Sequence, residues 1–194
     1  MSINGKHGIT ATTPQNVLLG AGTYHKGMKI TDGALEPGTI IGATNGGGKI
    51  SIKGEFYDIP VDGALVKVKG LTVKNGGTCT AEVTFAEISS AVLKAATLFA
   101  ESEDIVEGFT VLQDKAAIAE GDYVEGFGFI GKTANGAKDI VFIMENALCT
   151  SGLELEAKNK EAAVVKLTME AYANNEGGLD TLPIKILYPD NPVV

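Results

Sequence analysis

Apolar and polar side chains alternate along several stretches of this 194-residue chain, and a period of two is typical of β-strands. A short alternating run covers Lys49–Lys53. The longest pair of alternating runs covers Ala64–Lys74 and Thr78–Ile88, separated by the sequence Asn75-Gly76-Gly77. Because asparagine and glycine favour turns, we predict that these two runs form a β-hairpin.

The period changes at Ser89–Ala100, where Val92, Leu93, Ala96 and Phe99 recur at helical spacing. Either Ser89 or Ser90 is a suitable N-cap. This is the only stretch that we predict to be a clear helix. In a β-rich protein, its apolar stripe is expected to pack over an open end or face of the sheet.

Strand patterns return in the second half of the chain. We predict one hairpin from Asp122–Gly131 and Asp139–Asn146 around Asn135-Gly136, and another from Ser151–Ala157 and Ala162–Tyr172 with Asn159 in its turn. Ile184–Tyr188 is predicted as the last strand.

The first half contains weaker signals. Val17–Leu19 and Thr39–Ala43 are predicted as strands, whereas Gly20–Pro37 is predicted to be irregular. We expect Glu55–Pro60 to be a mobile loop because proline cannot donate a hydrogen bond in a central strand, and Asp62-Gly63 to form a turn.

These patterns predict a mainly β fold: an antiparallel β-sandwich or barrel with one flanking α-helix (about residues 89–100), extended loops and terminal arms. The expected organisation is a flexible N-terminal arm at residues 1–15, a single domain at residues 16–189 and a C-terminal tail at residues 190–194. A chain of this length can bury a sizeable core.

Charge narrows the classes of partner. The net charge is −8, and all 16 basic residues are lysines. Arginine is the usual residue for bidentate base and phosphate contacts, so an acidic chain without arginine is a poor candidate for gripping DNA or an anionic membrane. The sequence has neither an apolar run of membrane-spanning length nor a secretory signal pattern, so we expect the protein to stay in the cytoplasm where it was made. Cys79 and Cys149 are predicted to be small buried hydrophobes rather than a disulfide.

Two glycine-rich motifs superficially match nucleotide-binding loops. Residues 126–131 fit G-x-G-x-x-G, but a strand rather than a helix is predicted to follow. Residues 46–49 end in Gly-Lys, yet Ala43 and Ile50 occupy positions where a phosphate loop needs glycine and serine or threonine. His7 and His25 lack a metal-ligand spacing with the cysteines. We therefore expect no catalytic, cofactor-binding or metal-binding residues, and no enzyme. The acidic group Glu101, Glu103, Asp104 and Glu107 is expected to be a solvated face.

A series of short motifs occurs in a characteristic order: Gly42-Ala43-Thr44-x-Gly46-Gly47, Asp62-Gly63-Ala64, Val68-Lys69-Gly70, Asp122-Tyr123, Asn146-Ala147-Leu148, Ser151–Leu155, Ala171-Tyr172 and a short ending at Pro183–Pro189. In this order, over roughly residues 38–189, the chain resembles the tail tube (major tail) proteins of long-tailed bacteriophages. The resemblance implies subunits that join their sheets into rings, usually hexameric, with a continuous inner β-barrel. Such rings stack into a hollow tube that conducts DNA.

The resemblance also implies the partners. They are other copies of the chain, a tail tip or initiator protein, the tape measure protein and the tail terminator, with no membrane involved. Viral DNA would pass through without specific binding, and a lumen lined with carboxylates would repel its phosphates. The location implied is the tail of the virion, assembled in the cytoplasm of the host bacterium. Which carboxylates would face the lumen is left open, because a register slip of one residue exchanges the two faces of a strand.

Subunit contacts are expected in the loop from Gly54 to Gly63, with candidate interface residues Tyr57, Asp58, Ile59, Val61, Asp62 and Gly63. The N-terminal arm and residues 174–181 are further candidates. The alternative function is a monomeric β-sandwich binding module, for example for carbohydrate. That function needs an exposed aromatic platform, which five tyrosines, seven phenylalanines and no tryptophan supply only thinly.

Overall fold

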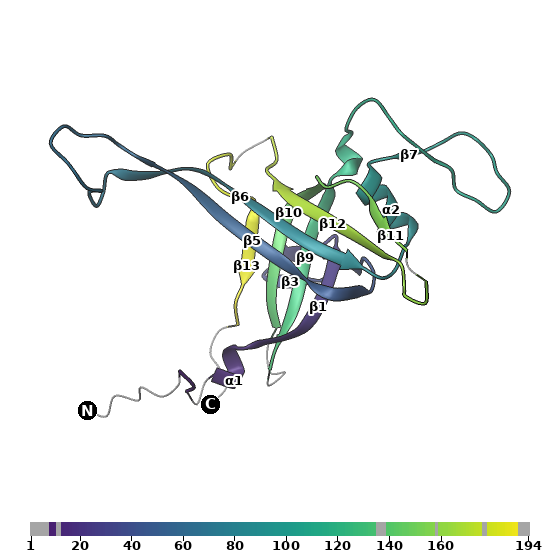
Figure 1. Cartoon of the computed structure of the whole chain (residues 1–194), viewed down its shortest axis with the longest axis horizontal. Helices are drawn as coiled ribbons and strands as arrows, with labels where there is room; N and C mark the ends of the chain where they lie inside the picture. Colours follow the sequence, from purple (N-terminus) through teal and green to yellow (C-terminus); the bar gives the residue numbers. More distant parts are fainter. Residues whose placement is uncertain (1–7, 11–12, 135–138, 158, 176–177, 190–194) are drawn as a thin grey trace.

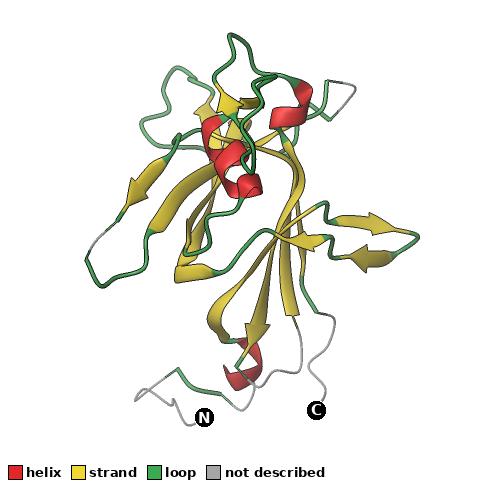
Figure 2. Ribbon diagram, turned by 90° about the vertical axis from the view of Figure 1, so that its right-hand side faces the viewer, coloured by secondary structure: helices red, strands yellow, loops and turns green. Residues whose placement is uncertain are grey.

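The computed structural model describes residues 8–10, 13–134, 139–157, 159–175 and 178–189. The fold is mainly β, as predicted, with a large antiparallel sheet and one substantial helix at its side (Figures 1 and 2). The strands of the main sheet are β1 (Leu18–Lys26), β4 (Thr39–Ile40), β5 (Thr44–Asp58), β6 (Thr72–Phe85), β9 (Val124–Thr133), β10 (Asp139–Cys149), β11 (Glu154–Glu156), β12 (Val164–Tyr172) and β13 (Ile184–Leu187).

The strand order is β4-β1-β9-β10-β12-β6-β5, with β11 paired to β12 and β13 paired to β10. Two small ribbons stand beside it, β2 (Lys29–Thr31) with β3 (Ala34–Glu36) and β7 (Ala100–Glu101) with β8 (Leu112–Gln113). The helices are the four-residue α1 (Thr13–Asn16), α2 (Ser90–Thr97) and the 3₁₀ turn η1 (Glu120–Asp122).

The main sheet curls so that its two ends approach each other. Strands β1 and β5 stand near opposite ends of the strand order, yet they are in contact. Tyr24 of β1 reaches the backbone of β5 at Gly48, where a side chain would collide with the tyrosine hydroxyl. The core inside this curl is a large cluster of buried side chains, and the bulkiest of those that are almost fully buried are Tyr24, Phe85, Met169, Val92 and Val165. A second, smaller cluster consists of Met28, Val141 and Ile143.

The G-x-G-x-x-G motif lies inside β9, and its structural role is packing. Phe127 and Phe129 lie on one face, with ring centroids 5.7 and 5.1 Å from that of Tyr24. Gly126 and Gly128 face Met28, whose backbone and sulfur occupy the space that side chains would need. The motif therefore lacks the strand-to-helix context of a dinucleotide site.

Helix α2 begins at the predicted cap. Ser89 Oγ accepts a hydrogen bond from Val92 N (3.2 Å), and Leu98 ends the helix in a left-handed conformation. Val92 and Ala96 are buried, and α2 contacts β10. The prediction of one amphipathic helix flanking the sheet is confirmed.

The hairpin predicted from Ala64–Lys74 and Thr78–Ile88 is wrong. β6 runs without a break through Asn75-Gly76-Gly77, and its hairpin partner is β5. The register shifts where Glu55 pairs with Gly76 and Phe56 pairs with Lys74, which leaves Asn75 as the extra residue of a β-bulge. The glycines therefore accommodate a bulge within a strand rather than a turn between strands.

Two other local predictions need correction. Residues 55–58, predicted to be part of a loop, continue β5, because Pro60 lies just beyond the last paired residue Asp58. The stretch Gly20–Pro37 contains most of β1 together with β2 and β3. The prediction was wrong because glycines in this stretch were taken as a sign of irregular backbone. They lie instead at an irregularity within β1 and in the turns beside it, with positive φ angles at Gly20, Gly22, Gly27 and Gly33.

The second-half hairpins are confirmed as β9–β10 and β11–β12, and β13 is confirmed as the last strand. Cys79 and Cys149 are both free and buried, as predicted. Asn135-Gly136, the C-terminal tail 190–194 and most of the N-terminal arm lie outside the described residues.

Candidate subunit interface

The longest feature of the molecule is the β5–β6 hairpin, which extends away from the core to the left in Figure 1. β12 pairs with β6 only from Thr80 to Phe85. Beyond Thr80, β5 and β6 pair with each other alone as far as Asp58 and Thr72. The outer half of the hairpin is therefore a two-stranded ribbon, which in isolation has little stability of its own in water.

All six candidate residues lie in this outer part. Tyr57 and Asp58 end β5, whereas Ile59, Val61, Asp62 and Gly63 belong to the connection to β6. Tyr57, Ile59 and Val61 are exposed. The structure thus brings the predicted residues together at one end of the molecule, and Asp62-Gly63 forms the predicted turn, with Gly63 at φ 87°.

Asp58 has a clear structural role at the base of the connection. Its carboxylate accepts a hydrogen bond from Thr72 Oγ1 (2.6 Å) and forms an ion pair with Lys67 Nζ (2.6 Å). The bond from Lys67, followed by the bond from Thr72, lowers the pKa of Asp58. The carboxylate thereby ties the connecting segment to the end of the ribbon.

The most exposed apolar side chains of this region were missed by the sequence analysis. Leu65 is 98% exposed, Val66 is 77% exposed and Phe56 is 70% exposed. The sequence analysis predicted a strand over Ala64–Lys74, but residues 64–71 form no strand. The sequence offered one signal that this segment is a loop, because a glycine stands at each of its ends. In the structure both of these glycines, Gly63 and Gly70, take positive φ angles.

A second projection lies on the opposite side of the molecule, at the upper right of Figure 1. It is the segment 102–111, which joins β7 to β8 and which we call the acidic loop. Ile105 is 96% exposed and Phe109 is 76% exposed. A hydrogen bond from Phe109 N to Val106 O (3.0 Å) closes its end. The predicted solvated acidic face is thus interspersed with exposed apolar side chains.

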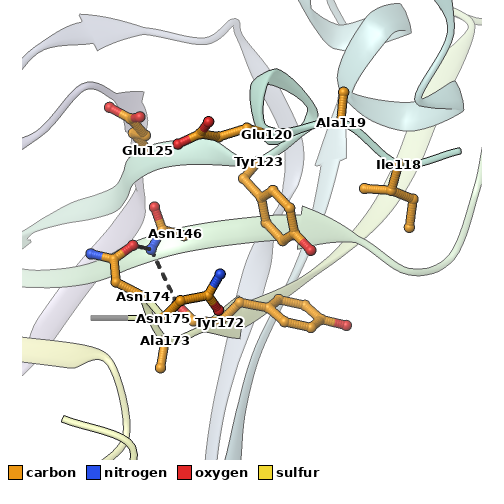
Figure 3. Close-up of a pocket in the computed structure, with 10 residues that line it drawn as sticks. All are labelled: Ile118, Ala119, Glu120, Tyr123, Glu125, Asn146, Tyr172, Ala173, Asn174 and Asn175. Carbon is orange, nitrogen blue, oxygen red and sulfur yellow. Dashed lines mark hydrogen bonds between the residues drawn. The ribbon is translucent and has the colours of Figure 1, made fainter. Parts of the chain in front are cut away.

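A separate cavity of about 670 Å³ lies between η1, the end of β12 and the segment that follows it. Figure 3 shows Tyr123 and Tyr172 on one side and Glu120, Glu125 and Asn146 on the other. The tyrosine rings meet edge to face, with centroids 5.6 Å apart. Asn146 Nδ2 donates to Asn174 Oδ1 (2.7 Å) and more weakly to the carbonyl of Tyr172 (3.3 Å).

Tyr172 is a residue of this cavity whose pKa is shifted. Burial, together with the nearby Glu170 and Tyr123, raises the pKa of Tyr172, so its phenol stays protonated at neutral pH. Phenol, amide and carboxylate groups beside an aromatic ring can bind a polar ligand such as a sugar. The edge-to-face packing, however, leaves no flat two-ring platform.

No group of three or more histidine, cysteine, aspartate or glutamate side chains among the described residues is arranged to hold a metal ion. The Gly-Gly-Gly-Lys sequence at residues 46–49 lies within β5, so no helix follows it as a phosphate loop would require. Within the described ranges, no helix has the length and apolar composition that crossing a lipid bilayer requires.

Comparison with protein-family models finds no family that matches this chain, and comparison with curated proteins finds no matching relative.

Proposed function

We propose that this protein is a structural subunit that assembles with copies of itself into rings, which stack into a tube like that of a long-tailed bacteriophage. The observation that carries the proposal is the β5–β6 hairpin. Its outer half has no strand partner on either side among the described residues, and it exposes Tyr57, Leu65 and Val66. Exposed strand edges and contiguous apolar side chains are aggregation hazards in a monomer, whereas both become contacts in an assembly.

The free edge of β5 supports the same proposal. β5 is the last strand in the order of the main sheet, and in the described residues its only strand partner is β6. An edge of this kind can add a strand from a neighbouring subunit through main-chain hydrogen bonds. Rings with a continuous sheet would form by this addition, and hexameric rings are what the resemblance to tail tube proteins implies.

The acidic character of the chain fits a conduit for DNA. A net charge of −8 without any arginine disfavours binding to phosphates, so DNA would slide through a tube of such subunits. The proposed partners remain an initiator or tail tip protein, the tape measure protein and the tail terminator, and the proposed location is the tail of the virion.

Electron microscopy of the purified protein at high concentration, paired with light scattering, tests the proposal. We expect rings or hollow tubes, alone or after addition of an initiator complex. A protein that stays monomeric under all these conditions would contradict the proposal.

Charge reversal in the hairpin provides a sharper test. We expect Asp58→Lys to impair assembly while the circular dichroism spectrum stays that of the wild type, because the change removes the partner of Lys67 and Thr72 at the end of the ribbon. Glu161→Lys, in the exposed connection between β11 and β12, is the matched control. Unchanged assembly of the Asp58 variant would count against an interface at this end of the hairpin.

The cavity between Tyr123 and Tyr172 favours a second candidate function, a monomeric carbohydrate-binding module. Calorimetric titration with a panel of oligosaccharides tests it, with Tyr172→Ala as the variant that should lose binding. No heat of binding with any sugar in the panel would remove the observation that supports this function.

A further inference from the structure

The two projections of this molecule complement each other in chemistry. We call residues 59–74 the hairpin tip; it contains Lys67, Lys69 and Lys74 with a single acidic residue, Asp62, so it carries a net charge of +2. The acidic loop, residues 102–111, contains Glu103, Asp104 and Glu107 with no basic residue, so it carries −3. The hairpin tip is thus a basic segment of a chain that is acidic as a whole.

Charged side chains on both projections lack an ion-pair partner among the described residues. Asp58 already pairs with Lys67, but Lys69 and Lys74 make no ion pair within the described part of the chain. Glu103 and Glu107 likewise make none there, whereas the neighbouring Glu101 pairs with Lys94. Within the described ranges, the hairpin tip therefore offers two unpaired lysines against the single unpaired Asp62, and the acidic loop offers unpaired carboxylates.

Both projections also expose apolar side chains at their ends. Leu65 and Val66 of the hairpin tip lie beside its lysines in sequence, and Ile105 and Phe109 of the acidic loop lie beside its carboxylates. Apolar contact can supply the affinity of an interface, and opposite charges around it supply orientation and partner choice.

The two projections cannot meet within one chain, because they lie at opposite ends of the longest axis of the molecule (Figure 1). We infer that the hairpin tip of one copy docks on the acidic loop of the next copy. This inference rests on the proposed self-assembly and names the surfaces that meet. The contact is heterologous, so its repetition generates a closed ring or an open stack of subunits rather than an isolated pair.

A charge-swap experiment tests the contact. One variant carries Lys69→Glu and Lys74→Glu, a second carries Glu103→Lys and Glu107→Lys, and a third carries all four changes. None of these residues makes an ion pair in the described chain, so each variant should keep its fold, which circular dichroism checks. We expect each two-site variant to assemble at least tenfold less than wild type by sedimentation at low salt, and the four-site variant to recover assembly.

The outcomes separate this inference from the proposed function. If wild type assembles and either two-site variant assembles equally well, the docking of these two surfaces is wrong while the tube function stands. The same conclusion follows if the four-site variant fails to recover. If wild type never assembles, the proposed function fails, and the contact is then judged by cross-linking.

Cross-linking uses single cysteines, because the native Cys79 and Cys149 are buried and burial raises the pKa of the Cys79 thiol to about 11. Leu65→Cys protein is mixed with Phe109→Cys protein under mild oxidation, so any disulfide between the two variants joins different copies. The control replaces Phe109→Cys by Ile186→Cys, an exposed position on β13. We expect the disulfide-linked heterodimer only in the first mixture; equal yields in both would overturn the inference.

Discussion

Close packing at a single glycine decides how the β2–β3 ribbon joins the core. Gly126 has φ 56°, and a β-carbon there would lie 2.2 Å from the carbonyl oxygen of Met28. Gly27 N donates a hydrogen bond to Glu125 O (2.8 Å), and Met28 N donates one to Gly126 O (3.0 Å). These two bonds hold the backbone of residues 27–28 against the backbone of residues 125–126. The position therefore needs glycine for its conformation and for its lack of a side chain.

We expect Gly126→Ala to lower the free energy of unfolding by about 2–4 kcal/mol, because it combines left-handed strain with overpacking against backbone. Urea unfolding followed by circular dichroism measures the change. Gly121→Ala is the matched control, since a β-carbon at position 121 meets no atom within 4 Å and the φ angle is not positive. Equal stabilities of the two variants would show that Met28 can move aside at little cost.

Asp122 shows how hydrogen bonds to a single carboxylate affect the stability of the fold. Burial alone would raise its pKa, but hydrogen bonds from Lys115 Nζ (2.5 Å) and Ala119 N (2.7 Å) outweigh burial and hold the pKa below its ordinary value of 3.8. The folded protein therefore binds this proton less readily than the unfolded chain. The carboxylate stabilises the fold above about pH 4, and this stabilisation is lost as the pH falls through the lower folded-state pKa.

We expect Asp122→Asn to be less stable than wild type by about 1–2 kcal/mol at pH 7, since charge-assisted hydrogen bonds are lost. The difference should shrink as the pH falls below about 4. Thermal or urea unfolding at pH 7 and at pH 3 checks this, with the exposed Asp180→Asn as control. A difference that stays constant with pH would mean that the ion pair with Lys115 contributes nothing.

At the scale of elements, local chemistry sets both ends of α2. Its cap Ser89 accepts a hydrogen bond from Val92 N, and its apolar positions Val92 and Ala96 enter the core. The helix then stops at Leu98, which donates its N–H to Lys94 O (2.9 Å) at φ 58°.

The cap distinguishes the two serines that the sequence left equivalent. We expect Ser89→Ala to cost about 1 kcal/mol of stability, because the N–H of Val92 loses its acceptor. Ser90→Ala, at the first helical position, should change stability by less than about 0.5 kcal/mol. Denaturant unfolding of both variants measures these losses of stability. Equal losses in the two variants would mean that Ser89 does not act as the cap in solution.

At the scale of the whole molecule, the core and the projections are separable. The buried cluster lies within the curled sheet, whereas the outer hairpin pairs with neither β12 nor any other strand apart from its own two, among the residues that the structure describes. An element that contributes this little to the core is free to serve contacts between copies.

Shortening the hairpin should therefore remove assembly and spare the fold. Asp58 and Thr72 are a directly paired register position, so an Asn-Gly turn can replace residues 59–71. We expect the shortened protein to keep its stability within about 1 kcal/mol, because a shorter loop changes closure entropy only slightly, and to form no rings or tubes. Calorimetric melting and electron microscopy measure the two properties. Normal tubes from the shortened protein would exclude the hairpin tip as an assembly surface.

Part of this fold was predictable because some signals are local. Alternation from Thr78 to Phe85 predicted half of β6, helical spacing and a serine cap predicted α2, and turn residues between alternating runs predicted β11–β12. The six candidate interface residues lie together at one projection because they are neighbours in sequence, and their role in subunit contacts stays a prediction. Side-chain period and capping depend on neighbours in sequence, which is why the chain itself determines them.

Only the tertiary structure decided which strands pair and which apolar side chains are buried or exposed. Asn75-Gly76-Gly77 has the composition of a turn, but pairing with β5 makes it a bulge in a continuous strand. Ala64–Lys74 was predicted as a strand, yet residues 64–71 pair with no strand among the described residues, so Leu65 stands in solvent. Strand pairing is a contact between residues distant in sequence, and its free energy depends on partners that no local pattern contains.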